Sequence, residues 1–303
     1  MMEFTEIQQN LSALLPKIQL CYEESMAKHT SFRIGGPAEV MAFPKDTQEL
    51  SQILQAAQKL QLKPIILGAG TNVLAPDAGI RGLVICLKDC LGGMEQLDAT
   101  HIRVYGGVTM TRAAVFAANL GLSGMEFAHG IPGTVGGGVY MNAGAYGGEI
   151  KDICCQVEVM DRQGNVRSLS NEEMGFSYRH SRLEDTDEIV ISADFALVPK
   201  TKEDIKAQMQ ELMTKRKTSQ PLDLPSAGSA FKRPAVGYAA ALIDQTGLKG
   251  YRVGDAAVSE KHAGFVVNLG SATAEDVKAL LEQVAKKVFD HTGIRLEPEV
   301  RIW

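Results

Sequence analysis

The sequence predicts a mixed helix and strand protein made of three successive units. Three observations carry this prediction. Apolar residues alternate between helical and strand-like spacing along the 303 residues. Two glycine-rich loops interrupt that pattern, and a Pro/Ser/Gly-rich stretch over residues 219–228 sets off the last unit. A chain of this length can form two or three domains of ordinary size.

The first unit is predicted over residues 30–90 by a helix followed by two buried strands. Residues 46–49 resemble a capping box and predict where the helix begins. Residues 64–67 and 83–87 are short apolar runs that are typical of buried strands. The residues expected on the buried face of the helix are Leu50, Ile53, Leu54, Ala57 and Leu60.

The second unit is predicted over about residues 95–200 by strands and one helix. A strand is expected to begin at His101, and a helix over residues 111–120 is expected to end at Gly121, because glycine commonly follows the last helical residue. Residues 157–169 predict a hairpin, and residues 189–198 predict a long alternating strand.

The third unit is predicted to follow a helix over residues 201–217. Further helices are expected over residues 239–244 and 273–291, with a strand over residues 265–268 between them. A final strand is expected over residues 296–302. On that strand, a period of two would place Glu299 on the same face as Glu297 and Arg301.

Composition excludes several classes of protein. A net charge of −5, with 22% charged and 45% apolar residues, is typical of a globular chain. The only basic run is Lys215-Arg216-Lys217, which argues against nucleic acid as a partner. No apolar run approaches the roughly 20 residues that a membrane span needs, and Met1-Met2-Glu3-Phe4 does not resemble a secretory signal. We therefore expect a cytoplasmic protein.

Five cysteines, at positions 21, 86, 90, 154 and 155, show no spacing typical of a zinc site or a disulfide framework. Buried thiols in a reducing cytoplasm are the simplest interpretation, and a catalytic cysteine is not expected. The histidines also lack metal-binding spacing such as H-E-x-x-H, so no metal is expected.

The densest glycine run is the most informative stretch. Nine glycines fall between Gly124 and Gly148, interleaved with apolar residues. Such a density is poor for a helix or a strand, because glycine loses the most backbone entropy on folding. The apolar residues argue against a flexible linker. The run is either a folded turn region or a backbone cradle for a phosphate or a flavin.

A second loop favours the cradle. A short strand over residues 64–67 runs directly into Gly68-Ala69-Gly70-Thr71-Asn72. A strand followed by a tight glycine turn aims backbone N–H groups at an anion. The spacing is not the dinucleotide fingerprint, since Val73 stands where that motif has glycine. Together the two loops indicate a cofactor that carries a pyrophosphate.

Two segments could supply a cationic side chain that binds a carboxylate and a hydroxyl that donates a proton. Arg179 follows Tyr178 between small polar residues; it is either a solvated surface residue or a clamp for a carboxylate, which a guanidinium binds bidentately. Ser229 follows Gly228 without the G-x-S-x-G elbow of an acyl nucleophile. It is either a turn residue or a proton donor placed near a reacting atom.

Two further segments carry carboxylate and imidazole groups. Glu299 is either a salt-bridged surface residue or a functional carboxyl group among apolar neighbours. Residues 258–262, which include Lys261 and His262, form either a polar turn or part of a binding site.

These segments, in their order along the chain, resemble the UDP-N-acetylenolpyruvoylglucosamine reductase (MurB) family, whose members are flavoenzymes of peptidoglycan precursor synthesis. The resemblance covers nearly the whole chain. No long tyrosine-bearing insertion follows Tyr178-Arg179, so the chain resembles the shorter second type of the family. Many members have asparagine where this chain has Arg233 and Gly264. The matching motifs lie at residues 30–36, 67–74, 130–138, 178–179, 228–232, 258–262 and 296–300.

The resemblance implies an α+β fold with an FAD-binding domain of the vanillyl-alcohol-oxidase (PCMH) type. That domain would have two subdomains, over residues 1–92 and 93–200, and the C-terminal strand at residues 295–303 would pack back on the first. A C-terminal α+β substrate domain would cover residues 201–294.

The resemblance implies non-covalent FAD and NADPH as hydride donor. The pyrophosphate would lie on residues 68–72 and the isoalloxazine near residues 130–138. Residues implied to bind the cofactor are Arg33, Gly68, Ala69, Gly70, Thr71, Asn72, Gly130, Ile131, Pro132, Gly133, Thr134, Gly136, Gly137, Asn142 and Gly144. Residues implied to bind the substrate are Tyr178, Lys232, Arg233, Lys261 and His262.

The implied reaction is a two-step relay. NADPH reduces FAD, and the flavin N5 then delivers hydride to C3 of the enolpyruvyl ether of UDP-N-acetylglucosamine. Arg179 and Glu299 match the catalytic residues that polarise the substrate carboxylate, and Ser229 matches the proton donor to C2. The implied role is cytoplasmic cell-wall synthesis, which supports cell shape and division. We expect a monomer with a small-molecule substrate and neither nucleic acid nor membrane as partner.

Two rival functions remain at this point. A flavin oxidase of the same fold, acting on a sugar or an alcohol, would leave Ser229 and Glu299 unexplained. A regulatory nucleotide-binding protein would keep the glycine loops but would not need Ser229.

Overall fold

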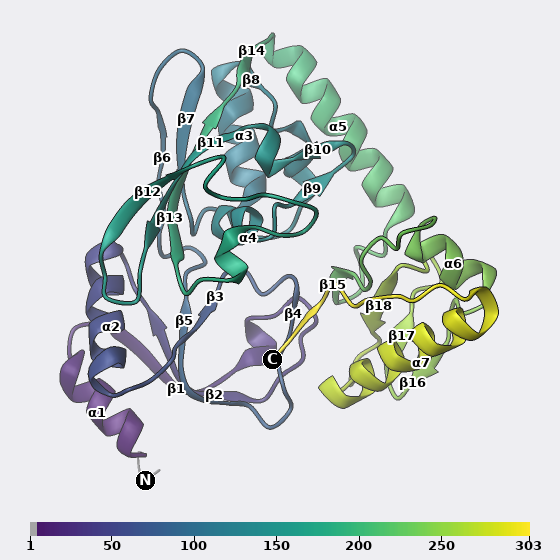
Figure 1. The fold of residues 1–303 in the computed structure, drawn as a ribbon, viewed down its shortest axis with the longest axis horizontal. Coiled ribbons are helices and arrows are strands. Elements are labelled where there is room, and N and C mark those ends of the chain that lie inside the picture. Colours follow the sequence, from purple (N-terminus) through teal and green to yellow (C-terminus); the bar gives the residue numbers. More distant parts are fainter. Residues whose placement is uncertain (1–4) are drawn as a thin grey trace. The chain divides into compact units, whose positions relative to one another are not determined.

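The computed structural model describes residues 5–303, and its chain divides into two compact units (Figure 1). The first unit comprises Met1–Tyr22, Glu39–Ala69 and Gly82–Lys215, and the second comprises the remaining segments, Glu23–Ala38, Gly70–Arg81 and Arg216–Trp303. Each unit has its own buried apolar residues and is described by itself. The prediction for Met1-Met2-Glu3-Phe4 lies outside the described residues.

The first unit begins with two helices and a four-stranded sheet of order β1-β2-β5-β3, in which β3 and β5 are parallel. Buried side chains from α1 and α2, such as Leu11 and Ile53, share one core with Leu83 and Ile85 of the sheet. The elements are α1 (Glu6–Leu14), β1 (Gln19–Ser25), β2 (Pro37–Phe43), α2 (Thr47–Lys59), β3 (Ile65–Leu67) and β5 (Ile80–Cys86).

Helix α2 confirms the prediction from its cap and its apolar spacing. The Asp46 side chain accepts a hydrogen bond from the Glu49 N–H at 2.8 Å and so caps the first turn. Only half of the expected capping box forms, because Glu49 accepts from the Lys45 N–H instead of from Asp46. All the predicted face residues except Leu60, which is half-buried, are buried.

The first unit also contains a five-stranded sheet of order β12-β11-β13-β7-β6. The predicted hairpin is confirmed as the antiparallel pair β11 and β12, and the predicted helix ends at Gly121 with a left-handed φ of 74°. Apolar side chains from α3 and from the sheet, including Ala113 and Phe195, form its main core. The elements are β6 (Met94–Gln96), β7 (His101–Tyr105), α3 (Met110–Leu120), β8 (Leu122–Ser123), β11 (Cys154–Met160), β12 (Val166–Ser170), β13 (Ile189–Ala196) and β14 (Val198–Pro199).

The glycine-rich segment contains a short helix, although its glycine density was expected to be poor for one. Thr134 caps this helix, α4, by accepting from the Gly137 N–H at 3.3 Å. Its residues pack closely on α3, since a methyl group added to Gly138 would lie 2.8 Å from the Met110 sulfur. Tertiary packing therefore outweighs the low helix propensity of glycine. The elements are η2 (Glu126–Gly130), α4 (Val135–Tyr140), β9 (Gly144–Ala145), β10 (Gly148–Glu149), η3 (Ile150–Asp152) and η4 (Arg182–Glu184).

The second unit pairs a four-stranded sheet, of order β15-β18-β17-β16, with helices α6 and α7. Helix α7 confirms the prediction; Thr273 and Asp276 form a full capping box, and Asp77 also accepts from the Ala274 N–H at 2.8 Å. Helix α5 runs from the first unit into the second. The elements are η1 (Met26–Lys28), β4 (Val73–Leu74), α5 (Lys202–Ser219), β15 (Ser226–Ser229), α6 (Ala239–Gln245), β16 (Arg252–Val253), β17 (Ala256–Val258), β18 (Phe265–Asn268), α7 (Ala274–Thr292) and β19 (Arg301–Ile302).

The predicted strand over residues 296–302 was wrong for most of its length. Only β19 is a regular strand, and it pairs in parallel with β4. Pro298 makes one isolated bridge with Phe231, because proline has no N–H to continue a ladder. Glu299 therefore lies in irregular chain, and the period-two argument for its facing does not apply.

Candidate active site

In the first unit, the two glycine loops meet. A methyl group added to Gly68 would lie 2.7 Å from the Thr134 hydroxyl oxygen, so Gly68 must lack a side chain for the loops to approach. Thr134 is buried, and its hydroxyl also caps the N-terminus of α4. The two loops that the sequence assigned to one cofactor thus approach each other within one unit.

Some glycines of the second loop serve packing, and others leave the backbone open. Gly136 donates its N–H to the Gly106 carbonyl at 2.9 Å, and the Met110 N–H donates to the Gly133 carbonyl at 3.0 Å. By contrast Gly137 is exposed, and a methyl group added there would meet only Thr134, at ordinary contact distance. A ligand could therefore approach the backbone at Gly137, whereas Gly136 and Gly138 are needed for the fold.

His129 lies immediately before the second glycine loop and was missed by the sequence analysis. Burial lowers the pKa of its imidazole, so the neutral form is favoured near neutral pH. Within residues 5–303, its buried Nδ1 has no hydrogen-bond partner. A buried polar atom that lacks a partner, next in sequence to the glycine loop, fits a polar cofactor such as FAD, which would supply the missing partner.

The first glycine loop continues in the second unit, where its backbone is held by residues 29–31. Gly70 has a left-handed φ of 61°, and a methyl group added there would overlap the His29 carbonyl oxygen. The Ser31 N–H donates to the Gly70 carbonyl at 3.0 Å. Arg33 is exposed at a φ of 57°, in a turn closed by its own N–H and the Thr30 carbonyl.

Also in the second unit, the structure brings the segments of Ser229 and Glu299 together. The Glu299 N–H donates to the Ala230 carbonyl at 2.9 Å, and the Lys232 N–H donates to the Glu297 carbonyl at 2.8 Å. These two hydrogen bonds hold the Ser229 and Glu299 segments side by side. Ser229 is exposed and Glu299 is half-buried, so the hydroxyl is open to a ligand.

A β-bulge and a left-handed glycine set the direction of Ser229. The pairing of β15 with β18 shifts register between Ser226 and Ser229. Gly228, inside the shift, has a φ of 77°. Bulges often redirect a side chain next to an active site. The Gly-Ser pair in the sequence thus marks a backbone feature as well as a hydroxyl.

Asn72 supports the Glu299 segment. Its side-chain amide donates to the Glu299 carbonyl at 3.0 Å, and the Arg301 N–H donates to the Asn72 carbonyl at 3.0 Å. The sequence analysis predicted Asn72 as a cofactor residue, and that role stays a prediction. The structure adds a contact between the end of the first glycine loop and a predicted catalytic residue.

Arg179 lies in the first unit, at the tip of a tight turn. Ser177 and His180 close this turn by exchanging backbone hydrogen bonds of 3.1 and 3.2 Å. The guanidinium donates to the Gly144 carbonyl at 3.2 Å and lies 4.9 Å from the centre of the Tyr178 ring. The predicted catalytic residues therefore fall in both units, Arg179 in the first and Ser229 with Glu299 in the second.

The predicted substrate-binding residues of the second unit have protein partners of their own. Lys261 donates to the Lys217 carbonyl at 2.6 Å, at the end of α5. His262 accepts from the Gly264 N–H at 3.1 Å through Nδ1, and burial lowers its pKa. Arg233 lies 4.3 Å from the centre of the Tyr238 ring. Their roles toward a substrate stay predictions, as does that of Lys232.

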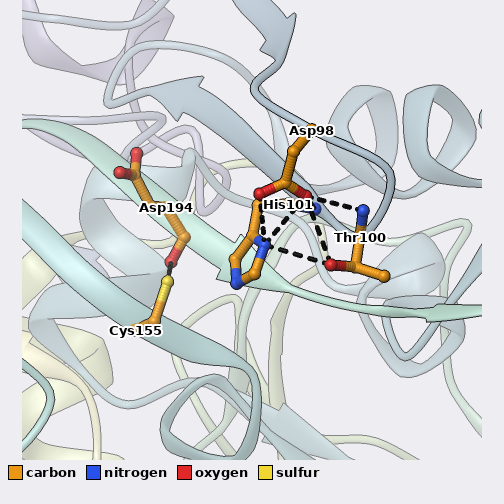
Figure 2. Close-up of polar contacts among 5 residues, drawn as sticks. All are labelled: Asp98, Thr100, His101, Cys155 and Asp194. Atoms are coloured by element: carbon orange, nitrogen blue, oxygen red, sulfur yellow. Dashed lines mark hydrogen bonds and ion pairs between the residues drawn. The ribbon is translucent and has the colours of Figure 1, made fainter.

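Reactive groups on the inner strands β11, β13 and β7 of the five-stranded sheet form local hydrogen bonds, as does the loop before β7 (Figure 2). The Cys155 thiol donates to the Asp194 carbonyl at 3.2 Å, and partial desolvation raises its pKa. The residue is nevertheless exposed, so the expectation of buried thiols was wrong for Cys155. The His101 ring hydrogen-bonds Asp98 at 2.9 Å. A raised thiol pKa does not suit a nucleophile. Within residues 5–303, no three His, Cys, Asp or Glu side chains group as metal ligands would.

Comparison with known proteins decides the family. Residues 220–303 match the model for the C-terminal domain of UDP-N-acetylenolpyruvoylglucosamine reductase, and residues 38–170 match an FAD binding domain. The chain is 46% identical over 299 residues to the UDP-N-acetylenolpyruvoylglucosamine reductase of Agathobacter rectalis, covering 95% of both chains. It is 43% identical over 293 residues to that of Clostridioides difficile, covering 97% of this chain and 96% of the relative.

The chain belongs to the UDP-N-acetylenolpyruvoylglucosamine reductase (MurB) family. A solved structure of MurB from Thermus caldophilus superposes with a TM-score of 0.78 at 34% identity, covering 95% of this chain and 99% of that one. The predicted family, the α+β fold with an FAD-binding domain and the assignment as an FAD-dependent oxidoreductase are confirmed. Within residues 5–303, every helix is too short or too polar to cross a membrane.

Proposed function

We propose that this enzyme reduces UDP-N-acetylglucosamine enolpyruvate to UDP-N-acetylmuramate with NADPH as the hydride donor, in peptidoglycan precursor synthesis. The observation that carries the proposal is the pairing of the Ser229 and Glu299 segments through the Ala230 carbonyl, within the part of the chain that matches the family's C-terminal domain. When bound, FAD would supply the hydride transfer from NADPH to C3 of the enolpyruvyl group.

The chain's own residues would handle the charge and the proton. As C3 gains hydride, negative charge develops at C2 and spreads into the neighbouring carboxylate. Arg179 and Glu299 would stabilise that carboxylate, with Glu299 either protonated or held by hydrogen bonds so that it can face the developing anion. The Ser229 hydroxyl would give its proton to C2, which completes the addition of H₂ across the double bond. Each preorganised group of this kind is worth roughly 2.7–4 kcal/mol of transition-state stabilisation.

The glycine loops would hold FAD without a covalent bond. Gly68 lets the two loops approach each other, Gly137 presents backbone without a side chain, and His129 would donate or accept a hydrogen bond through Nδ1. The proposed division of labour gives residues 1–92 and 93–200 to FAD and residues 201–294 to the substrate. The family matches at residues 38–170 and 220–303 support it. We also propose that the enzyme works in the cytoplasm as a monomer.

An anaerobic flavin titration tests the proposal. NADPH should bleach the 450 nm band of the FAD-loaded enzyme, and UDP-N-acetylglucosamine enolpyruvate should restore it. Ser229→Ala should still bleach with NADPH but recover at least about 10²-fold more slowly, which is the loss expected for one preorganised donor. A flavin restored by oxygen but not by the enolpyruvyl substrate would contradict the proposal and favour a sugar or alcohol oxidase.

A further inference from the structure

The turn that carries Arg179 has an unusual backbone. Arg179 is the third residue of the four-residue turn closed by Ser177 and His180, and its φ is 55°. Type II turns have positive φ at this position, which normally selects glycine or asparagine. A larger residue keeps this conformation only where surrounding structure enforces it. Two buried polar side chains provide that support, one on each side of Arg179.

Asn142 supports the turn from the N-terminal side. Its side chain is fully buried, with 0% exposure, and its amide donates to the Ser177 carbonyl at 2.8 Å and to Glu149 at 2.9 Å. Its side-chain oxygen accepts from the Lys151 N–H at 2.9 Å. Both amide protons and an oxygen lone pair are therefore engaged inside the protein.

Ser181 supports the turn from the C-terminal side. It is also fully buried, and its hydroxyl donates to the Tyr140 carbonyl at 2.8 Å. The two anchors thus tie both ends of the turn to one segment, residues 140–149, which continues from the second glycine loop.

The same segment supplies the acceptor for the guanidinium. Gly144, whose carbonyl accepts from Arg179, pairs with Glu149 across a two-residue hairpin. The hairpin tip, Tyr146-Gly147, has positive φ at both residues, as a type I′ turn requires. Glu149 in turn accepts from Asn142 and pairs with Lys151 at 3.0 Å. Asn142 therefore holds both the turn that carries Arg179 and the hairpin whose Gly144 carbonyl accepts from its guanidinium.

We propose that Asn142 and Ser181 are positioning residues for Arg179. They hold the turn so that the guanidinium takes one place relative to the second glycine loop, and they do not touch the cofactor or the substrate themselves. This inference rests on the proposed function, in which Arg179 stabilises the substrate carboxylate. It replaces the expectation that Asn142 binds FAD, since its amide protons are both used within the protein.

The test compares two half-reactions of the full-length, FAD-loaded enzyme in stopped flow. Asn142→Ala and Ser181→Ala should keep their FAD and should be reduced by NADPH within about twofold of the parent rate. Reoxidation by UDP-N-acetylglucosamine enolpyruvate should slow by about 10²-fold in Asn142→Ala, the loss that a displacement of about 1 Å of a catalytic group can cause. Ser181→Ala, which loses one anchor bond, should slow less.

Asn268→Ala is the control. Asn268 is also a buried asparagine, and its amide donates to the Phe32 carbonyl at 3.0 Å while its oxygen accepts from the Gly270 and Ala272 N–H groups, all within the second unit. It should lower thermal stability without slowing the reoxidation step. A general loss of rigidity would slow both asparagine variants alike, and that outcome would overturn the inference.

Arg179→Ala separates the inference from the proposed function. If Arg179→Ala reoxidises at the parent rate, the proposed role of the arginine fails and the positioning role fails with it. If Arg179→Ala is slow but Asn142→Ala is normal, the positioning inference alone is overturned. In the expected case, the double variant is no slower than Arg179→Ala, because both changes remove the same interaction. Loss of FAD from Asn142→Ala would overturn the inference, and if that variant does not fold, the Ser181→Ala rate decides.

Discussion

Replacing Gly70 by alanine should damage the first glycine loop more than a left-handed backbone alone explains. Gly70 has a φ of 61°, where an L side chain costs about 1–2 kcal/mol. The added methyl group would also overlap the His29 carbonyl oxygen and lie 3.0 Å from the Thr30 Cα. Backbone atoms cannot rotate away as a side chain can, so overpacking adds about 1–3 kcal/mol. The expected total is about 2–5 kcal/mol.

Gly247 provides the matched control in the same unit. It has a φ of 73° after helix α6, and a methyl group added there would meet nothing within 4 Å. Gly247→Ala should therefore show only the left-handed strain of about 1–2 kcal/mol. The difference between the two variants isolates the close approach of the Gly70 loop to residues 29–30.

Thermal unfolding and FAD content measure the two consequences. The Tm should fall by roughly 2–4 °C for each kcal/mol, so Gly70→Ala should melt lower than Gly247→Ala. Because the loop is the proposed pyrophosphate site, Gly70→Ala should also lose FAD during gel filtration, whereas Gly247→Ala should keep it. Equal Tm shifts in the two variants would refute the packing argument. Full FAD retention by Gly70→Ala would refute the assignment of the loop.

Three further predictions follow from single contacts. Asn72→Ala removes one hydrogen bond to the Glu299 carbonyl, so it should lower the free energy of unfolding by about 1 kcal/mol and also slow turnover. Asn268→Ala loses hydrogen bonds to Phe32, Gly270 and Ala272, so it should lower the Tm more but leave the turnover of the folded enzyme unchanged. Slower turnover in Asn268→Ala than in Asn72→Ala would contradict the role of Asn72. Burial lowers the pKa of His262, so below about pH 6.5 the unfolded chain binds a proton at this residue more readily than the folded chain, and the free energy of unfolding decreases as the pH is lowered. His262→Asn cannot titrate in this range, so its free energy of unfolding in urea should decrease less between pH 7.5 and pH 5.5. An equal decrease in the parent protein and the variant would contradict this account. Burial raises the pKa of Cys154 to about 12, so iodoacetamide should alkylate this thiol more slowly at pH 7.5 in the folded than in the urea-unfolded protein. Labelling of Cys154 that is equally fast or faster in the folded protein, measured by mass spectrometry, would contradict this account.

Helix ends and amphipathic faces were predictable because their causes are local. The cap at Asp46, the left-handed Gly121 and the capping box of α7 each depend on residues within one turn of the helix. The hairpin of β11 and β12 was predictable for the same reason, since its strands are close in sequence. Local rules therefore gave most of the helices, whereas many strands, among them β1, β2 and β6, were not predicted.

Two errors in the predicted fold came from packing and from an overlooked proline. Helix α4 forms in glycine-rich sequence because Gly136 and Gly138 let it approach residues 106–110, a contact that no window of sequence shows. The C-terminal strand was overextended because Pro298 was not weighed, although proline confines a strand to edges or bulges. The first error needed the structure, and the second did not.

The two asparagines show why the motifs located the site better than they assigned its roles. An asparagine beside a glycine loop suggests a ligand contact, because its amide both donates and accepts. The same property suits it to bind the carbonyls that tight turns leave unpaired. Asn72 reaches a carbonyl 227 residues away and Asn142 one 35 residues away, and in each case that segment carries a proposed catalytic residue. Such partners are set by the fold, so the sequence could name the residue type but not its contact. If Asn142→Ala slows the same half-reaction as Arg179→Ala, Asn142 contributes to catalysis by holding the backbone of the Arg179 turn. If Asn142→Ala instead loses FAD, Asn142 is a cofactor-binding residue.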